Sequence, residues 1–89
     1  MKISVNKKMV TRIIDGEYYI VDPDNQVLHS LNETGTFIFK QLKKGVIQPE
    51  EVVNALCEKF ETDALTAEED VDEFFRKMEK KKIVKCQKD

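Results

Sequence analysis

One histidine, two cysteines and a run of carboxylates are the side chains of this 89-residue sequence that could do chemistry. His29 is the only imidazole, and a general base needs an oriented nucleophile beside it. The hydroxyl that follows it in the sequence belongs to Ser30, and both thiols are distant. The chain also lacks a glycine-rich phosphate loop, a G-x-S-x-G motif and an H-E-x-x-H motif. We therefore interpret His29 as a partly exposed strand residue and expect neither a catalytic residue nor an enzyme.

The carboxylates between Glu68 and Glu73 resemble a metal-binding cluster in composition only. They fall in the first turns of a predicted helix, where negative charge is favourable near the amino end. A zinc site would need scattered ligands, because Cys57 and Cys86 form no C-x-x-C motif. A disulfide between them is weakly supported, since small secreted domains usually carry more cysteines. We expect solvated carboxylates, free thiols and no metal or other cofactor.

The composition is typical of a soluble globular domain, with 40% hydrophobic and 36% charged residues. The length allows one domain over residues 1–89, with a core from about 9 to 84 and a basic tail at 85–89. No apolar run is long enough to span a membrane, and the amino end lacks the features of a secretory signal. The sequence therefore predicts a cytoplasmic protein, and we expect a monomer.

Strand patterns fill the first third of the chain. Lys8–Ile14 and Glu17–Asp22 are predicted strands joined by Asp15-Gly16, a strong hairpin-turn signal. A second turn at Pro23-Asp24-Asn25 leads into a third predicted strand, Gln26–Ser30. Two connections this short favour an antiparallel meander of three strands.

Three amphipathic helices are predicted after the strands. Asn32 is placed to cap the first, which Gly45 ends. Gly35 lies inside this helix, where glycine costs about 1 kcal/mol relative to alanine, so we expect close packing against a neighbouring element. Residues spaced by three and four should form one buried face of this helix: Leu31, Gly35, Ile38 and Leu42, with Phe39 beside them.

The second helix is predicted to open at Pro49, and the third at Thr66, which begins a Thr-x-x-Glu capping box. The order β-β-β-α-α-α predicts an α+β fold of winged helix-turn-helix type, with a three-stranded antiparallel sheet ahead of three helices. The apolar stripes of the two helices are Val52, Val53, Leu56 and Phe60, and then Val71, Phe74, Phe75 and Met78.

Charge is divided unevenly along the chain. Ten acidic residues and one base lie between Glu50 and Glu73, whereas seven bases and two acids lie from Arg76 onward. Helix electrostatics accounts for much of this division, and a basic patch for an acidic partner is the other interpretation. DNA binding by the winged helix is the alternative function, but acids at the amino half of the third helix would repel phosphates. A sequence pI near 5.5 also disfavours nucleic acid.

Three segments taken together resemble one known family: LHSLNETGTFIFKQLKKG, PEEVVNALCEKF and DVDEFFRKMEKKKIV. They resemble the PqqD family, whose fold is also called the RiPP recognition element, over roughly Met9 to Val84. The sequence departs from the family pattern at Gly35, where alanine is more common, and at Lys82, where a glycine commonly closes the third helix. The matching positions are Leu31-Asn32, Gly45, Val52-Val53, Leu56, Asp70-Val71 and Phe74-Phe75.

The resemblance implies a non-catalytic peptide chaperone for natural-product biosynthesis. Such a domain captures the leader of a ribosomally made precursor peptide and presents it to a modifying enzyme, often a radical-SAM protein. The leader adds as a strand along the third strand, in a groove walled by the third helix. Membership in coenzyme PQQ synthesis itself does not follow.

The expected peptide-binding residues lie on these two elements. Phe75 and Met78 are candidates for the helix wall, and a purely core role for both stays open. Arg76 and Lys80 could pair with leader carboxylates, or form a merely solvated face. A proline at Val27 is expected to harm leader binding more than folding if that amide is free. The full predicted set is Gln26, Val27, Leu28, His29, Ser30, Phe75, Arg76, Met78, Glu79 and Lys80.

Overall fold

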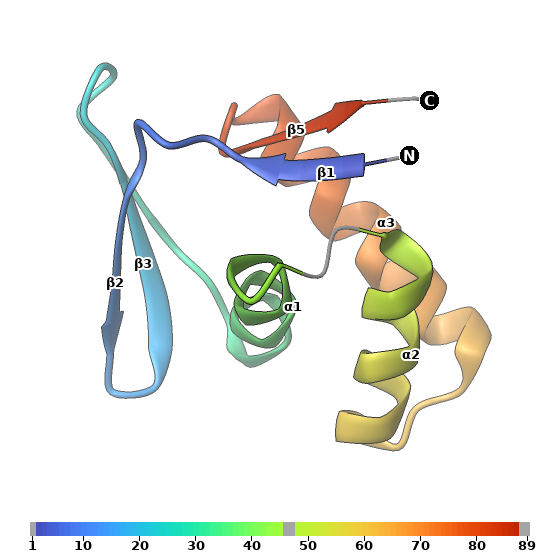
Figure 1. The fold of residues 1–89 in the computed structure, drawn as a ribbon. Coiled ribbons are helices and arrows are strands. Elements are labelled where there is room, and N and C mark those ends of the chain that lie inside the picture. Colours follow the sequence, from blue (N-terminus) through green and yellow to red (C-terminus); the bar gives the residue numbers. More distant parts are fainter. Residues whose placement is uncertain (1, 46–47, 88–89) are drawn as a thin grey trace.

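The computed structural model describes residues 2–45 and 48–87 and shows an α+β fold. The predicted order of three strands and three helices is confirmed, and one further strand lies at each end of it (Figure 1). The elements are β1 (Lys2–Val5), β2 (Val10–Ile14), β3 (Glu17–Asp22), β4 (Val27–Ser30), α1 (Glu33–Lys43), α2 (Pro49–Phe60), α3 (Ala64–Lys80) and β5 (Val84–Gln87).

Strands β2, β3 and β4 form the predicted antiparallel meander, which we call the wing. Asp15 and Gly16 both have positive φ, at 52° and 84°, as a tight type I′ hairpin turn requires. The predicted first strand began too early, because Lys8 N–H donates to Asn6 Oδ1 in a turn. The predicted third strand also began one residue early, since Gln26 adopts a left-handed φ of 55°.

Strands β1 and β5 pair with each other as a separate antiparallel sheet, which the sequence analysis missed. Ile83-Val84 was expected only as an apolar segment that packs back onto the core. Ile83 and Val84 are buried as expected, and Val84 also opens β5. The sheet places the two ends of the chain side by side (Figure 1).

Helix α1 begins at the predicted cap. Asn32 Oδ1 accepts a hydrogen bond of 2.8 Å from the Gly35 N–H. A Cβ added at Gly35 would lie 3.2 Å from Phe74 Cε2, so the glycine permits close approach to α3, as expected. The helix ends before Gly45, which has a φ of 98°.

Replacing the α1 cap tests its contribution to stability. We expect Asn32→Ala to lower the free energy of unfolding by about 1 kcal/mol, because it removes the acceptor for the Gly35 amide. For a domain of this size the melting temperature should fall by roughly 4–8 °C, measured by circular dichroism. Asn54→Ala, at an exposed position inside α2, is the matched control and should change little. An equal loss in both variants would contradict a capping role.

Helix α3 begins before the predicted position. Its cap is Asp63, whose Oδ1 accepts a hydrogen bond of 2.8 Å from Thr66 N–H. The prediction of a cap at Thr66 was therefore wrong: Thr66 lies inside the first turn and donates both its amide and its hydroxyl to Asp63. These bonds favour the ionised carboxylate and lower the pKa of Asp63. The start of α2 at Pro49 is confirmed.

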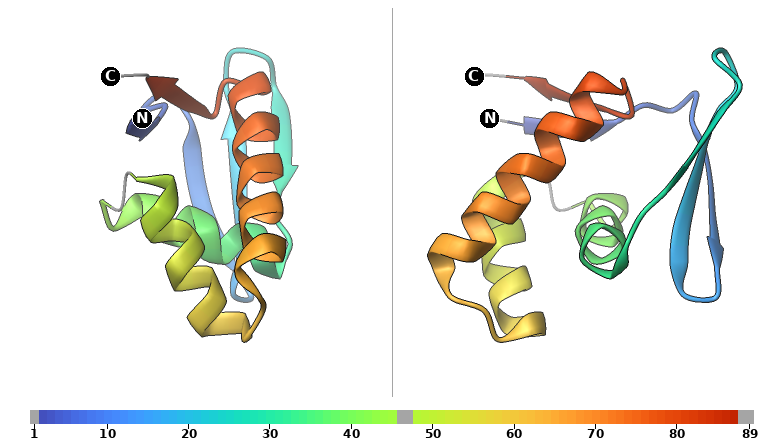
Figure 2. Two further views of the ribbon diagram at one scale, coloured as in Figure 1. Left: turned by 90° about the vertical axis from the view of Figure 1, so that its right-hand side faces the viewer. Right: turned by 180° about the vertical axis from the view of Figure 1, so that it is seen from behind.

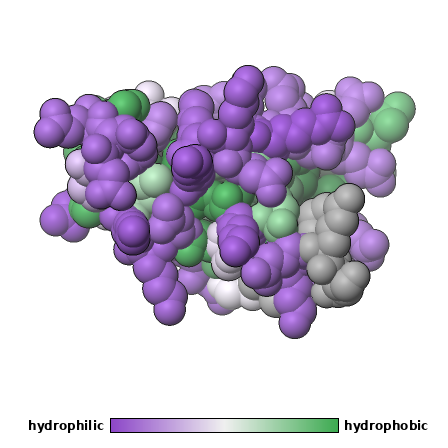
Figure 3. Space-filling view, turned by 90° about the horizontal axis from the view of Figure 1, so that it is seen from above, coloured by the Kyte–Doolittle hydropathy of each residue, from purple (hydrophilic) through white to green (hydrophobic). Residues whose placement is uncertain are grey.

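Helix α1 packs between the wing on one side and α2 and α3 on the other (Figure 1). Phe39 of α1 meets Tyr18 of β3 in an edge-to-face contact, with ring centroids 4.9 Å apart. Tyr18 N–H donates to Thr36 Oγ1 at 3.1 Å, which ties β3 to α1 through a buried hydrogen bond. Seen from the side of β1 and β5, hydrophilic side chains cover most of the surface, with hydrophobic surface between them (Figure 3).

The turn between β3 and β4 is organised by Asp22, whose side chain is nearly inaccessible at 5% exposure. Its Oδ2 accepts from Asn25 Nδ2 at 2.8 Å, and its Oδ1 accepts from the amides of Asp24 and Asn25. The Asn25 side chain is the main cause of a lowered pKa at Asp22, with the two amides adding to it and burial opposing it.

This carboxylate makes stability depend on acid pH. Because the folded pKa is below the ordinary value of 3.8, its stabilising effect is complete above that value and is lost as pH falls through the folded pKa. We expect urea unfolding to show wild type more stable than Asp22→Asn at pH 7, with the difference shrinking below pH ~3.8. A difference that stayed constant down to pH ~2 would contradict this role.

Candidate functional site

Strand β4 forms an outer edge of the wing, because it pairs with β3 alone among the described residues. Leu31 N–H donates to the Tyr18 carbonyl at 3.0 Å, which fixes that pair as hydrogen-bonded. Such pairs alternate along an antiparallel ladder, so the main chains of His29 and Val27 also face β3. The N–H and C=O groups of Leu28 and Ser30 therefore point outward from the sheet.

This alternation corrects the expectation for a proline at Val27. The Val27 amide faces β3, where Val27 is paired with Asp22, so proline there would disturb the ladder itself. The amides that point to the open edge are those of Leu28 and Ser30. A test of strand addition by proline therefore belongs at Leu28.

A groove of about 330 Å³ lies at the carboxyl end of β4, and we call it the β4 groove. The second view in Figure 2, from behind, shows β4 and α3 on either side of the amino end of α1. The groove is lined by Ser30 and Leu31 at the end of β4, by Asn32, Thr34, Gly35 and Ile38 of α1, and by Asp70, Glu73, Phe74, Lys77, Met78 and Lys81 along α3.

Charge changes sign along the α3 wall of the β4 groove. Asp70 and Glu73 lie toward the amino end of α3, and Lys77 and Lys81 lie toward its carboxyl end. Lys77 Nζ is 2.9 Å from Glu73 Oε1, but both side chains are largely exposed, so this ion pair adds little stability. These charges remain accessible to a ligand in the groove.

The structure divides the predicted peptide-binding residues among several places. Ser30 and Met78 line the β4 groove, although Met78 is itself largely buried. Val27 and Leu28 are exposed on β4, at 42% and 62%, on opposite faces of the sheet. His29 is half-buried, which agrees with its interpretation as a partly exposed strand residue, and Gln26 lies in the preceding turn.

The remaining predicted residues of α3 do not line the β4 groove. Phe75, Arg76 and Glu79 line a second cavity, between α2 and α3, and Lys80 lines neither. Arg76 is 2.9 Å from Asp72 in an exposed ion pair one turn earlier. The sequence analysis missed Phe74, Lys77 and Lys81 as groove residues, although their spacing with Met78 puts all four on one face of a helix.

The cysteines and carboxylates of the described residues form neither a disulfide nor a metal-type cluster. Cys57 and Cys86 are free thiols, as expected. Burial and the neighbouring Glu79 carboxylate raise the pKa of Cys86, which makes its thiolate less available at neutral pH. Among residues 2–45 and 48–87, no three carboxylate, histidine or thiol groups gather as a metal site would require. None of the helices described combines the length and apolar character needed to cross a bilayer.

The DNA-binding alternative gains no support from the structure. The exposed carboxylates Glu68, Glu69 and Asp70 stand near the amino end of α3, the part of a reading helix that contacts base edges in helix-turn-helix proteins. Phosphates would be repelled there.

Comparison with known proteins identifies one family and similar solved structures. The sequence model of the family described as Coenzyme PQQ synthesis protein D matches residues 17–84. The solved structure of TbiB1 in complex with the TbiA(beta) leader peptide is similar with a TM-score of 0.88 and 27% identity, over 97% of this chain and 99% of that one. Lasso peptide synthetase B1, complexed with the leader peptide, shares the fold with a TM-score of 0.86 at 17% identity, over 97% and 100% of the two chains. No curated protein matched the chain.

Proposed function

The chain belongs to the PqqD family, and from this premise we propose that it binds the leader of a ribosomally synthesised precursor peptide. The leader adds as a strand to the open edge of β4 and lies in the β4 groove against α3. The similarity to TbiB1, a protein solved with a leader peptide, supports this function. The whole of residues 1–89 acts as one non-catalytic module in this proposal.

The outward main chain of β4 is the observation that carries the proposal. Leu28 and Ser30 each present one N–H and one C=O to the open edge. Unpaired strand edges are templates for pairing with another chain, and a peptide can satisfy these groups by β-augmentation. Within the described residues no segment of the protein itself pairs with this edge.

Backbone pairing alone is too weak for tight binding. About four added hydrogen bonds at roughly 0.5–1.5 kcal/mol each give about 2–6 kcal/mol. Ordering a flexible peptide costs about 2–5 kcal/mol, whereas micromolar affinity requires about 8 kcal/mol in total. The difference must come from side-chain contacts.

The two faces of an added strand offer such contacts. Side chains of the leader would alternate between the β4 groove, near Phe74, and the outer face of the wing, near Leu28. Burying one large apolar side chain contributes about 1.5–3 kcal/mol, so one or two leader anchors would suffice. Lys77 and Lys81 would favour a leader that carries carboxylates toward the carboxyl end of α3.

The module would present the bound leader to a peptide-modifying enzyme, such as a radical-SAM protein, in the cytoplasm. A free leader is flexible, so a leader held along β4 meets the enzyme at a defined position. Holding the leader in this way raises the effective concentration of the linked core peptide at the enzyme.

Titration of the ¹⁵N-labelled protein with the leader of a precursor encoded by a neighbouring gene tests the proposal. We expect amide shifts at Leu28, Ser30 and along the α3 wall at Phe74 and Lys77. A scrambled leader is the control and should produce no shifts at the same concentration. A leader concentration of about 1 mM detects complexes with a binding free energy as weak as about −4 kcal/mol. Unchanged spectra at this concentration would count against the proposal for that leader.

A further inference from the structure

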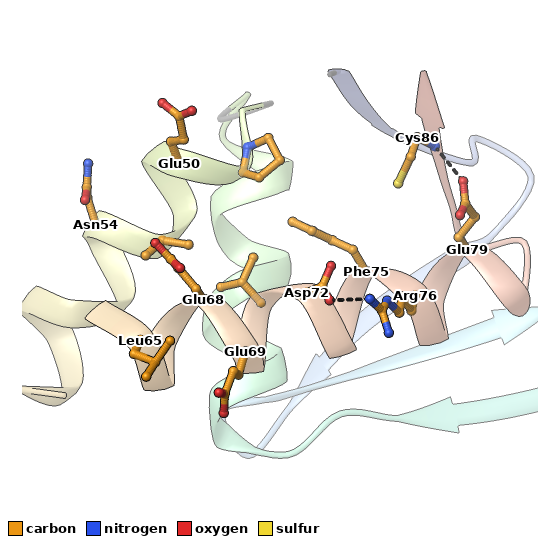
Figure 4. Close-up of a pocket in the computed structure, with 13 residues that line it drawn as sticks. Glu50, Asn54, Leu65, Glu68, Glu69, Asp72, Phe75, Arg76, Glu79 and Cys86 are labelled. Carbon is orange, nitrogen blue, oxygen red and sulfur yellow. Dashed lines mark hydrogen bonds and ion pairs between the residues drawn. The ribbon is translucent and has the colours of Figure 1, made fainter. Parts of the chain in front are cut away.

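A cavity of about 870 Å³ lies between α2 and α3, on the opposite side of α3 from the β4 groove. We call it the α2–α3 cleft. Figure 4 shows Phe75 pointing into it, with Leu65 near the start of α3 and Cys86 of β5 at the other end. The proposed leader site uses none of these residues.

The walls of the α2–α3 cleft are apolar. Val53 of α2 and Val71 and Phe75 of α3 contribute to its lining. Leu65 extends this surface and is 67% exposed, whereas Val71 and Phe75 are buried. An exposed leucine that continues an apolar wall leaves surface that a partner could cover.

The rim of the cleft is strongly acidic. Among the lining residues that the structure describes, Arg76 is the only base, and it lies 2.9 Å from Asp72. The remaining acids face no base among the lining residues, so a partner of complementary charge must be basic. The five carboxylates of the lining are Glu50, Glu68, Glu69, Asp72 and Glu79.

The main-chain hydrogen bonding of the helices that line the cleft indicates which secondary structure the partner has. Helices α2 and α3 use their N–H and C=O groups internally. At the β5 end of the cleft, the Cys86 N–H already donates to Glu79 Oε2 at 3.3 Å, so the walls offer little free backbone to an extended peptide. A helix brings its own backbone hydrogen bonds and presents only side chains, which is how amphipathic helices bind hydrophobic grooves. The cleft thus fits a helix with an apolar stripe flanked by lysine or arginine.

We infer that the α2–α3 cleft is the docking site for a basic amphipathic helix of the enzyme that modifies the precursor, an inference that rests on the proposed leader-binding function. Phe74 faces the β4 groove and Phe75 faces the cleft, and their rings touch with centroids 5.8 Å apart. A thin wall therefore separates the two sites, and both can be occupied at once. The enzyme would hold α2 and α3 on one side while the leader extends along the other.

The chemistry can be tested with a model peptide of leucine and lysine, about 18 residues long with leucine at helical spacing, a length at which an isolated helix is marginally stable. We expect it to shift the amides of Val53, Leu65 and Phe75 in the full-length ¹⁵N-labelled protein. A peptide with glutamate in place of lysine is the matched probe and should not bind. Equal binding of the two peptides would overturn the charge argument.

Charge-reversal variants on the two faces of α3 distinguish binding of the peptide in the cleft from nonspecific electrostatic attraction of a basic peptide to an acidic protein. Glu68→Lys with Asp72→Lys should weaken binding of the leucine–lysine peptide about tenfold or more. Asp70→Lys with Glu73→Lys changes the net charge equally on the other face and should weaken it less than about threefold. Leu65→Ala should weaken it about fivefold, because an apolar contact is lost. Equal losses in the two charge-reversal variants would overturn the proposal.

Two further measurements distinguish this inference from the leader-binding proposal. The charge-reversal variant of Glu68 and Asp72 should bind leader normally, and Leu28→Pro should bind the model peptide normally. If the wild-type protein bound the helical peptide in the cleft but did not bind the leader, the leader proposal would be contradicted and the cleft would still be a helix-binding site. Concentration-dependent shifts at Leu65 without any peptide would show a second copy of the chain in the cleft and would overturn the enzyme docking site.

Discussion

Leu28→Pro is expected to weaken leader binding by about 2–3 kcal/mol, or roughly 30- to 150-fold, while the protein stays folded. The Leu28 amide points to the open edge of the wing, so proline removes no hydrogen bond of the free protein. In the complex it removes one bond to the leader and leaves a leader carbonyl unpaired. Isothermal titration with the leader measures the loss, and an unchanged amide spectrum of the α-helices confirms the fold.

Two controls separate the Leu28 amide from other effects of that substitution. Leu28→Ala keeps the amide and removes only the exposed side chain, so it should weaken leader binding less than proline does. Val27→Pro removes an amide that faces β3 and should lower the free energy of unfolding, whereas Leu28→Pro should not. Wild-type leader affinity in Leu28→Pro would contradict strand addition at this edge.

The largest effect on stability is expected from Phe39→Ala. Phe39 has no exposed surface, and its ring joins α1 to Tyr18 of β3. Truncation of a fully buried phenylalanine lowers the free energy of unfolding by about 3–5 kcal/mol, because contacts are lost and a cavity is left. For a small domain this corresponds to a fall in melting temperature of roughly 15–30 °C, measured by calorimetry.

Leu65→Ala provides the comparison for Phe39→Ala. It removes a hydrophobic side chain that is 67% exposed, so the free energy of unfolding should change by less than about 0.5 kcal/mol. If the two substitutions destabilised the protein equally, the burial of Phe39 would not explain its role. A loss below about 1 kcal/mol for Phe39→Ala would also contradict it.

Local sequence patterns predicted the wing and the three helices because each has its own local signal. Asp15-Gly16 specifies a hairpin, Asn32 caps α1 and Pro49 opens α2. The cap of α3 was misassigned because two residues that commonly cap helices, Asp63 and Thr66, lie three positions apart. The structure uses Asp63, whose Oδ1 accepts the hydrogen bond from the Thr66 N–H.

Strands β1 and β5 lack a comparable local signal. Each is four residues long, and each finds its pairing partner only at the opposite end of the fold. Ile3 is buried because β5 and the core cover it, and nothing in its immediate neighbours indicates this. The pairing of Ile3 with Cys86 is set by the tertiary fold, which brings the two strands together, and not by local sequence.

The candidate site was predicted in part, for a definite physical reason. That β4 would end the meander, and so lie at an edge, follows from the order of the strands. Which face of α3 turns toward that edge depends on how α3 crosses α1 and α2. Phe74 and Phe75 are both buried, so burial alone could not show that Phe74 lines the β4 groove and Phe75 the α2–α3 cleft.

The end of α3 carries Lys82 at the position where the family pattern leads us to expect glycine. Lys82 adopts a left-handed φ of 62°, which glycine would adopt without strain. Asn6 Nδ2 donates to the Lys82 carbonyl at 2.9 Å, and Asn6 N–H donates to the Ile83 carbonyl at 2.8 Å. These contacts hold the turn that leads into β5.

The pairing of β1 with β5 also governs when the fold can be completed during translation. The ribosome adds roughly 5–20 residues per second, so β1 emerges several seconds before Val84–Gln87 exist. During this interval β1 has two unpaired edges and could associate with strands of other nascent chains. The wing, whose strands are contiguous in sequence, can form much earlier, but the β4 groove is completed only by α3, which ends a few residues before β5.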